Sequence, residues 1–184
     1  METPPLTQPD PPPIRVNRAP VLTLWAAVVA ERLGHPVDTA FSLASHVAGT
    51  AAQAKARRLG IAEEHGKGAE HGGDAAPHPR ETVRLLGRDV PVAHGGDGAV
   101  LADDGGGKPA PAAPAQAYVA KAFGARLDEA RAAMEALAAS VPPEELNRTG
   151  FRLYEHFRPE VPPDARGWGA KGELHLRRIR EAAG

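Results

Sequence analysis

A largely apolar run, Val21–Ala30, constrains the fold of this chain more than any other stretch of the sequence. Pro20 stands before it, where a proline suits the first turn of a helix, and Gly34 follows as a helix stop. A helix that spans a membrane needs about 20 apolar residues, which is more than this run offers. We therefore expect a helix with a broad apolar face, in a soluble protein, with Ile14 to Arg18 leading into it.

The residues that follow predict two more helices. Pro36 begins the first of them, and Val37, Ala40, Phe41, Leu43, Ala44 and Val47 supply its apolar side. Gly49 and Thr50 are expected to interrupt it, with Thr50 capping a third helix from Ala51 to Leu59. Residues 14–62 are thus interpreted as an N-terminal helical segment.

The middle of the chain changes character. Residues 63–80 are rich in glycine and histidine without a period, which predicts a flexible loop. Three short runs, Thr82–Leu86, Asp89–Ala93 and Gly98–Ala102, alternate as strands do and are expected to form a β-meander over residues 81–102, with a turn at Gly87-Arg88. Residues 103–114 (DDGGGKPAPAAP) are interpreted as a linker.

The C-terminal segment, residues 115–184, is expected to be helical again. It contains a short helix closed by Gly124, an apolar stripe from Leu127 to Val141, and a helix opened by Pro143. Residues 166–172 (RGWGAKG) read as a glycine-punctuated turn before a short final helix with Arg177, Arg178 and Arg180 on one side. The fold class expected is mainly α with a small β-meander, divided into N-terminal and C-terminal helical segments.

Composition narrows the classes of function. The net charge of −1 excludes a polycation that coats nucleic acid or an anionic membrane. The absence of cysteine excludes disulfides, thiolate nucleophiles and cysteine-ligated metals. Residues 1–13 (METPPLTQPDPPP) lack the features of a signal peptide and are interpreted as a disordered, proline-rich tail. We expect a cytoplasmic protein with no membrane partner and no cofactor.

Two segments, RVNRAPVLTLWAAVVAERLG from Arg15 to Gly34 and the stretch from Phe157 to Arg180 that contains RGWGAKGELHLRRIR, resemble an uncharacterised protein family found in bacteria and some fungi. Residues 115–141 resemble it as well. Because no activity, cofactor or partner is established for that family, the resemblance assigns a role to no residue here.

The N-terminal helices suggest a helix-turn-helix that binds double-stranded DNA. Ala30 and Gly34 have the spacing of the small residue and turn glycine of such a motif. The second helix would then expose Asp38, Thr39, Ser42 and Ser45 to the bases. Arg15 and Arg18, together with Lys55, Arg57 and Arg58, would contact phosphates. A plain helical hairpin gives the same pattern, and the expected recognition face carries no Arg, Lys, Asn or Gln, the usual base readers.

A helical module that binds a protein partner, or forms a homodimer, is the alternative. Trp168 and Lys171 lie in the glycine-punctuated turn, where a tryptophan can anchor an interface or fold back onto the core. The stripe from Leu127 to Val141 can likewise be a dimer seam or an internal core face.

An enzyme is the third hypothesis, and we expect no metal site. His65, His71 and His78 form the densest group of possible metal ligands, but their spacing fits no rigid element. Glu155-His156 and the pair Glu173 and His175 could exchange protons. Adjacent residues on a helix or strand point apart, so neither pair converges by itself. The sequence therefore leads with a nucleic-acid-binding or regulatory protein, then an interaction module, then an enzyme of unknown class.

Overall fold

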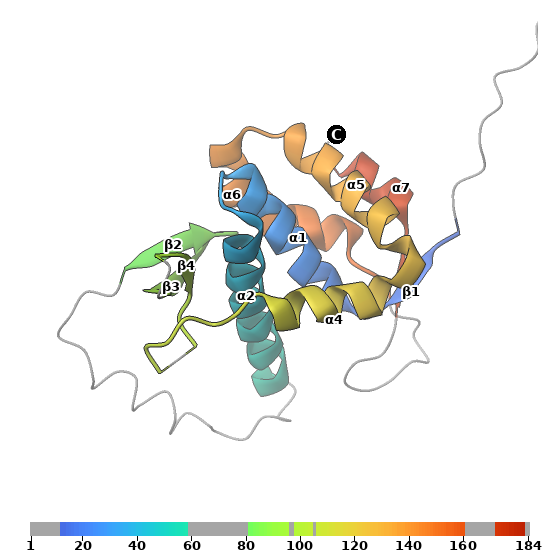
Figure 1. The fold of residues 1–184 in the computed structure, drawn as a ribbon. Coiled ribbons are helices and arrows are strands. Elements are labelled where there is room, and N and C mark those ends of the chain that lie inside the picture. The colour runs from blue at the N-terminus through green and yellow to red at the C-terminus, as the bar shows by residue number, and fades with distance from the viewer. Residues whose placement is uncertain (1–11, 59–80, 96–97, 105, 161–171, 183–184) are drawn as a thin grey trace, which may run out of the picture.

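A computed structural model describes residues 12–58, 81–95, 98–104, 106–160 and 172–182. For residues 50–58 it describes the backbone alone. The protein is mainly helical, as expected, and contains two small antiparallel sheets, one of which is the expected meander (Figure 1). No helix among these residues has the length and hydropathy to cross a membrane.

Helix α1 (Arg18–Arg32) is the centre of the fold. Every residue from Pro20 to Ala30 is buried, because α1 is packed by α2 (Val37–Arg58), α4 (Ala113–Phe123), α5 (Leu127–Ala139) and α6 (Pro143–Phe157). A helix that is apolar on all sides belongs in a core. It ends at Arg32, just before the expected stop at Gly34, whose φ of +105° lets the His35 N–H reach the Ala30 carbonyl at 3.1 Å.

Helix α2 corrects the sequence interpretation, which broke it at Gly49 and Thr50. It is a single helix of 22 residues, Val37–Arg58, and the expected third helix is its continuation. An exposed glycine inside a helix costs only about 1 kcal/mol relative to alanine. Burial of Ala40, Leu43 and Val47 against α1 offsets that cost.

The β-meander is present as predicted, with β2 (Thr82–Leu85), β3 (Arg88–His94) and β4 (Val100–Ala102) paired antiparallel in that order. The turn is one residue earlier than expected, at Leu86-Gly87. Both residues have positive φ, 53° and 76°, which is the geometry of a two-residue hairpin turn that matches the strand twist. Leu86 accepts this conformation while its side chain is buried in the core.

A second sheet was not predicted. Strand β1 (Ile14–Val16) pairs antiparallel with β5 (Gly172–Leu174), where the sequence suggested a lead into α1 and a turn. Glu160 adds two backbone hydrogen bonds to Glu173 on the other side of β5. Gly172 is required there, since a Cβ would lie 2.8 Å from the Glu160 carbonyl oxygen.

The C-terminal helices cover the remaining sides of α1. A 3₁₀ turn, Gly124–Arg126, joins α4 to α5, and α7 (Leu176–Glu181) packs on α5 and α6. The stripe predicted from Leu127 to Val141 is a core face: Ala130, Met134 and Leu137 are buried within this chain, against α1 and α7. That stripe is therefore closed to a second copy.

Candidate interaction surface

The proposed recognition positions Thr39 and Ser42 are buried rather than exposed. The Thr39 hydroxyl donates to the Val100 carbonyl at 2.7 Å, and the Ser42 hydroxyl donates to the Ala110 carbonyl at 2.6 Å. Ser42 Oγ also accepts the Ala102 N–H at 2.8 Å. Small polar residues tolerate burial when each hydroxyl is hydrogen-bonded. This side of α2 therefore holds the meander and the chain after it, and no major groove could reach it.

The two arginines expected to contact phosphate have different positions. The Arg18 guanidinium is half-buried and donates from Nε to the Pro159 carbonyl at 3.0 Å. Burial, with the neighbouring Arg158 charge, lowers the pKa of Arg18 from its usual value. Arg15 is exposed on β1, in register with Glu173 of β5. Arg18 thus connects the start of α1 to the residues that follow α6. Of the two arginines, Arg15 is the one that is exposed to solvent.

The other predicted contacts are described only in part. Lys55, Arg57 and Arg58 continue the backbone of α2, and their side chains lie outside the described residues. Trp168 and Lys171, the predicted partner anchor, lie outside them too, as do residues 1–11 of the proposed tail and the loop with His65, His71 and His78. The roles suggested for these residues stay predictions.

A charged junction lies where α2 meets the meander. His46 is one turn beyond Ser42 and is half-buried. Burial lowers the pKa of His46, the Asp103 carboxylate opposes that shift, and Arg88 adds to it. Arg88 in turn lies over the Phe151 ring, 5.3 Å from its centroid, and Asp103 Oδ1 accepts the Gly107 N–H. These contacts connect α2, the meander and α6, which is a structural role.

The pairs considered for acid–base chemistry do not converge. Glu155 and His156 are both exposed on α6, and the Glu173 carboxylate lies 3.9 Å from the His175 imidazole, beyond hydrogen-bond distance and partly exposed to solvent. Within the described part of the chain, no three His, Cys, Asp or Glu residues are grouped as a metal ion would require. Nothing in these positions assembles a catalytic constellation.

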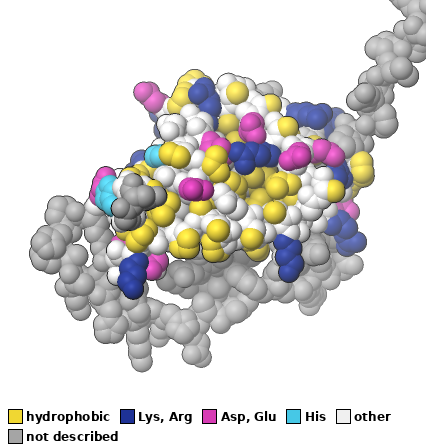
Figure 2. All heavy atoms as spheres, in the orientation of Figure 1, with side chains coloured by type: hydrophobic (Ala, Val, Ile, Leu, Met, Phe, Trp, Pro, Cys, Tyr) yellow, Lys and Arg dark blue, Asp and Glu magenta, His cyan; other side chains and the backbone are white. Residues whose placement is uncertain are grey.

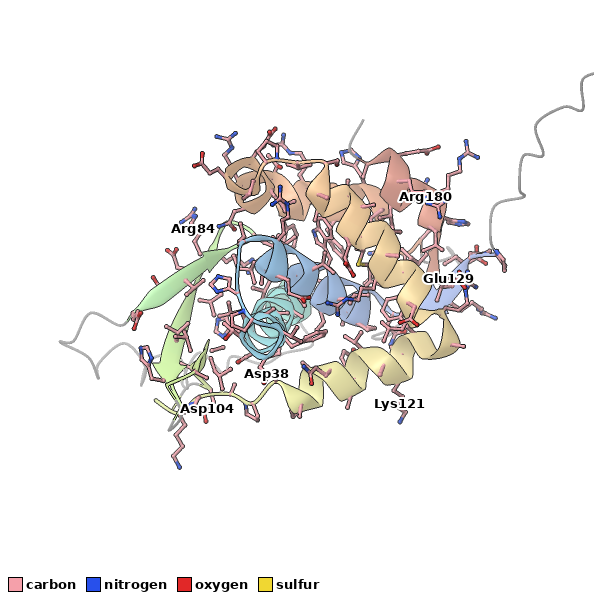
Figure 3. The ribbon with its side chains drawn as sticks, turned by 45° about the horizontal axis from the view of Figure 1, so that its top comes forward. Asp38, Arg84, Asp104, Lys121, Glu129 and Arg180 are labelled. Carbon is pink, nitrogen blue, oxygen red and sulfur yellow. The ribbon has the colours of Figure 1, made fainter. Side chains whose placement is uncertain are left out.

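The outer face of α4 differs from the other helical surfaces. Six of its residues are exposed and only one is charged; they are Ala113, Pro114, Ala117, Tyr118, Ala120 and Lys121. Figure 2 shows hydrophobic side chains gathered over this part of the molecule, and Figure 3 shows Lys121 extending away from the fold. We call these six residues the α4 surface.

Two large apolar side chains are strongly exposed, Tyr118 on the α4 surface and Val37 at the start of α2. Tyr118 and Val37 are each 46% exposed, which makes them the most exposed large hydrophobic residues of the described chain. Partial burial raises the pKa of Tyr118 above its usual value. Val37 begins α2, whose next residue, Asp38, accepts a hydrogen bond from Gln116 of α4 at 3.4 Å. The start of α2 therefore lies beside helix α4, at a residue of that helix outside the α4 surface.

Sequence reasoning did not single out this surface. Residues 115–123 predict a helix, but alanine occurs on its inner and outer sides alike, so the apolar pattern does not reveal which side faces solvent. The available signal was the near absence of charge: from Ala110 to Ala120 the sequence contains no Asp, Glu, Lys or Arg.

The comparisons with known proteins do not assign this chain to a family. It matches no family model, and no curated protein or solved structure shows significant similarity to it. The resemblance suggested by residues 15–34 and 157–180 therefore stays a prediction.

Proposed function

We propose that this chain is a protein-interaction module that does not bind nucleic acid, and that a partner binds at the α4 surface. The observation that carries the proposal is the contrast between helices. The exposed residues of α6 include Glu144, Glu145, Arg148, Arg152 and Glu155, whereas the α4 surface offers alanine, proline and tyrosine with a single lysine. Interface centres are depleted in charge and in alanine and enriched in tyrosine, so the low charge and Tyr118 carry the proposal and the alanines do not.

The size of the surface specifies the kind of partner. Helix α4 has 11 residues, which gives a strip about 16 Å long. With a width of about 10 Å, it is far smaller than the roughly 800 Å² that each side of a stable interface between folded proteins buries. It suits one helix or one extended segment of a partner, a common mode of recognition.

The DNA hypothesis loses its main support in this arrangement. The hydroxyls of Thr39 and Ser42 are hydrogen-bonded to Val100 and Ala110, and the guanidinium of Arg18 is hydrogen-bonded to Pro159. Asp38, which precedes Thr39, is exposed and acidic. A titration of a labelled DNA duplex of about 25 base pairs with the protein, at two salt concentrations, tests whether any DNA binding remains. We expect no binding that weakens steeply with salt; such binding would return DNA to first place, through Lys55, Arg57 and Arg58.

Photo-crosslinking tests the interaction directly. A benzoylphenylalanine replaces Tyr118 in the full chain, produced in cells that make the protein, and replaces the exposed Ala136 of α5 in the matched control. We expect a discrete crosslinked product from position 118 that contains a second protein, with none from position 136. Ala117→Glu should reduce its yield, because it places a charge within the apolar surface.

Crosslinks of equal yield at both positions, or none at position 118, would refute the proposal. A product that contains only a second copy of this chain would identify the module as self-associating, which remains within the proposed class.

A further inference from the structure

The chain carries an N-terminal segment, Met1–Pro11, whose chemistry complements the α4 surface. Its sequence, METPPLTQPDP, is rich in proline and contains two carboxylates, Glu2 and Asp10, but no Lys or Arg. The α4 surface carries a single charge, the ammonium of Lys121. Proline-rich segments bind grooves lined by aromatic rings, and Tyr118 offers such a ring.

The described chain begins at the correct end of α4 for such a contact. The carbonyl of Pro12 accepts a hydrogen bond from Arg126 Nη2 at 3.0 Å, and Arg126 lies in the 3₁₀ turn that directly follows α4. Strand β1, which continues from Pro12, also contacts α4. Lys121 lies in the last turn of that helix. Asp10 is two residues before Pro12, about 6 Å along an extended chain.

The length of the segment is sufficient. Eleven residues in the polyproline conformation extend about 34 Å, and the helix beneath them is about 16 Å long. A tethered segment experiences an effective concentration in the millimolar range, so even weak contacts with this surface are populated.

We propose that residues 1–11 bind the α4 surface of their own chain, with Asp10 against Lys121 and prolines against Tyr118. This inference rests on the surface identified in the proposed function and deepens it: the segment is an internal competitor that an external partner must displace.

Fluorine NMR of the full chain tests the contact, because the protein contains only two tyrosines. With 3-fluorotyrosine incorporated, Tyr118 reports on the surface, and Tyr154, buried in the core, serves as the internal control. We expect deletion of residues 1–11 to shift the Tyr118 resonance and leave that of Tyr154 unchanged. The shift should be independent of protein concentration, as an intramolecular contact requires.

Charge exchange provides the second variant. Asp10→Lys should reproduce part of the change seen on deletion, and combination with Lys121→Asp should reverse it. An unchanged Tyr118 resonance in the deletion variant would overturn the proposal, and so would a change that disappears on dilution, since that would mean contact between copies.

The two proposals fail separately. If residue 118 crosslinks to a partner but its resonance ignores the deletion, the α4 surface stands and the internal competitor is wrong. If the deletion moves the resonance but no partner crosslinks, residues 1–11 bind the α4 surface and the external partner of the proposed function is wrong.

Discussion

The indole N–H of Trp25 donates a hydrogen bond to the backbone carbonyl of Gly150 across 2.9 Å, connecting the central helix to a residue 125 positions later. Trp25 is fully buried and meets the Phe157 ring edge to face, with centroids 5.3 Å apart. Tyr154 extends this aromatic cluster from Phe157. The contact holds α6 close to α1, and on the same stretch of α6 the Leu86 side chain of the hairpin turn leaves no room for a Cβ at Gly150.

Gly150→Ala should therefore destabilise the protein. A Cβ at this position would lie 2.5 Å from Leu86 Cδ2, and Leu86 is itself buried in a constrained turn. Overpacking of this kind costs about 1–3 kcal/mol, of which the better helix propensity of alanine returns up to about 1 kcal/mol. The free energy of unfolding in urea measures it, with Gly49→Ala as the matched control. Gly49 is helical with nothing within 4 Å of its Cβ position, so that variant should gain about 0.5–1 kcal/mol.

Ser42→Ala should loosen the meander. The variant leaves the Ala102 N–H and the Ala110 carbonyl without their buried partner, which costs about 1–3 kcal/mol. Hydrogen exchange should accelerate at the Ala102 amide before it accelerates in α1. Ser45→Ala is the control, since its hydroxyl donates to the Ser42 carbonyl one turn back and its loss should leave Ala102 protected. Equal protection in both variants would contradict the role assigned to Ser42.

Tyr154 should make stability fall in alkali. Burial raises its pKa to about 12, against 10.0 in the unfolded chain. The folded state therefore keeps a proton that the unfolded state releases, so this contribution is complete below pH 10 and is lost as the pH rises toward 12. A difference of two pKa units corresponds to about 2–3 kcal/mol. Urea midpoints between pH 8 and 12 should decline less in Tyr154→Phe than in the parent protein.

Tyr118→Ser should leave stability nearly unchanged. The side chain is exposed on α4, and surface substitutions usually change the free energy of unfolding by less than about 0.5 kcal/mol. Thermal and urea unfolding should match the parent within that margin. A larger loss would mean that Tyr118 supports the fold, in which case effects of its substitution on binding could not be attributed to a surface contact.

The sequence predicted the elements whose signals are local. Helix α1 follows from the apolar run after Pro20, and the hairpin follows from alternation around Gly87. The continuous α2 was missed because a glycine is a stop signal only where no tertiary packing carries the helix past it. The pairing of β1 with β5 was missed because each strand has three residues and the partner lies more than 150 positions away.

The candidate site required the tertiary structure. Thr39 and Ser42 were expected at the surface because they are polar. Their hydroxyls instead donate to the backbone carbonyls of Val100 and Ala110, and no local sequence pattern indicates partners that far along the chain. Tyr118 was not noticed because a tyrosine among alanines predicts burial as readily as exposure. Which side of α4 faces solvent depends on where α1 and α2 pack against it.

The all-round burial of α1 has a consequence for the biogenesis of the protein. Its neighbours include α2, which follows at once, but also α5 and α6, which begin only at residues 127 and 143. At about 5–20 residues per second, a ribosome needs several seconds to deliver them after α1 has emerged. During that interval the nascent chain exposes part of a helix that the folded protein buries on all sides. Chaperone binding to α1 should therefore peak while the meander is being made and end once α6 has been synthesised.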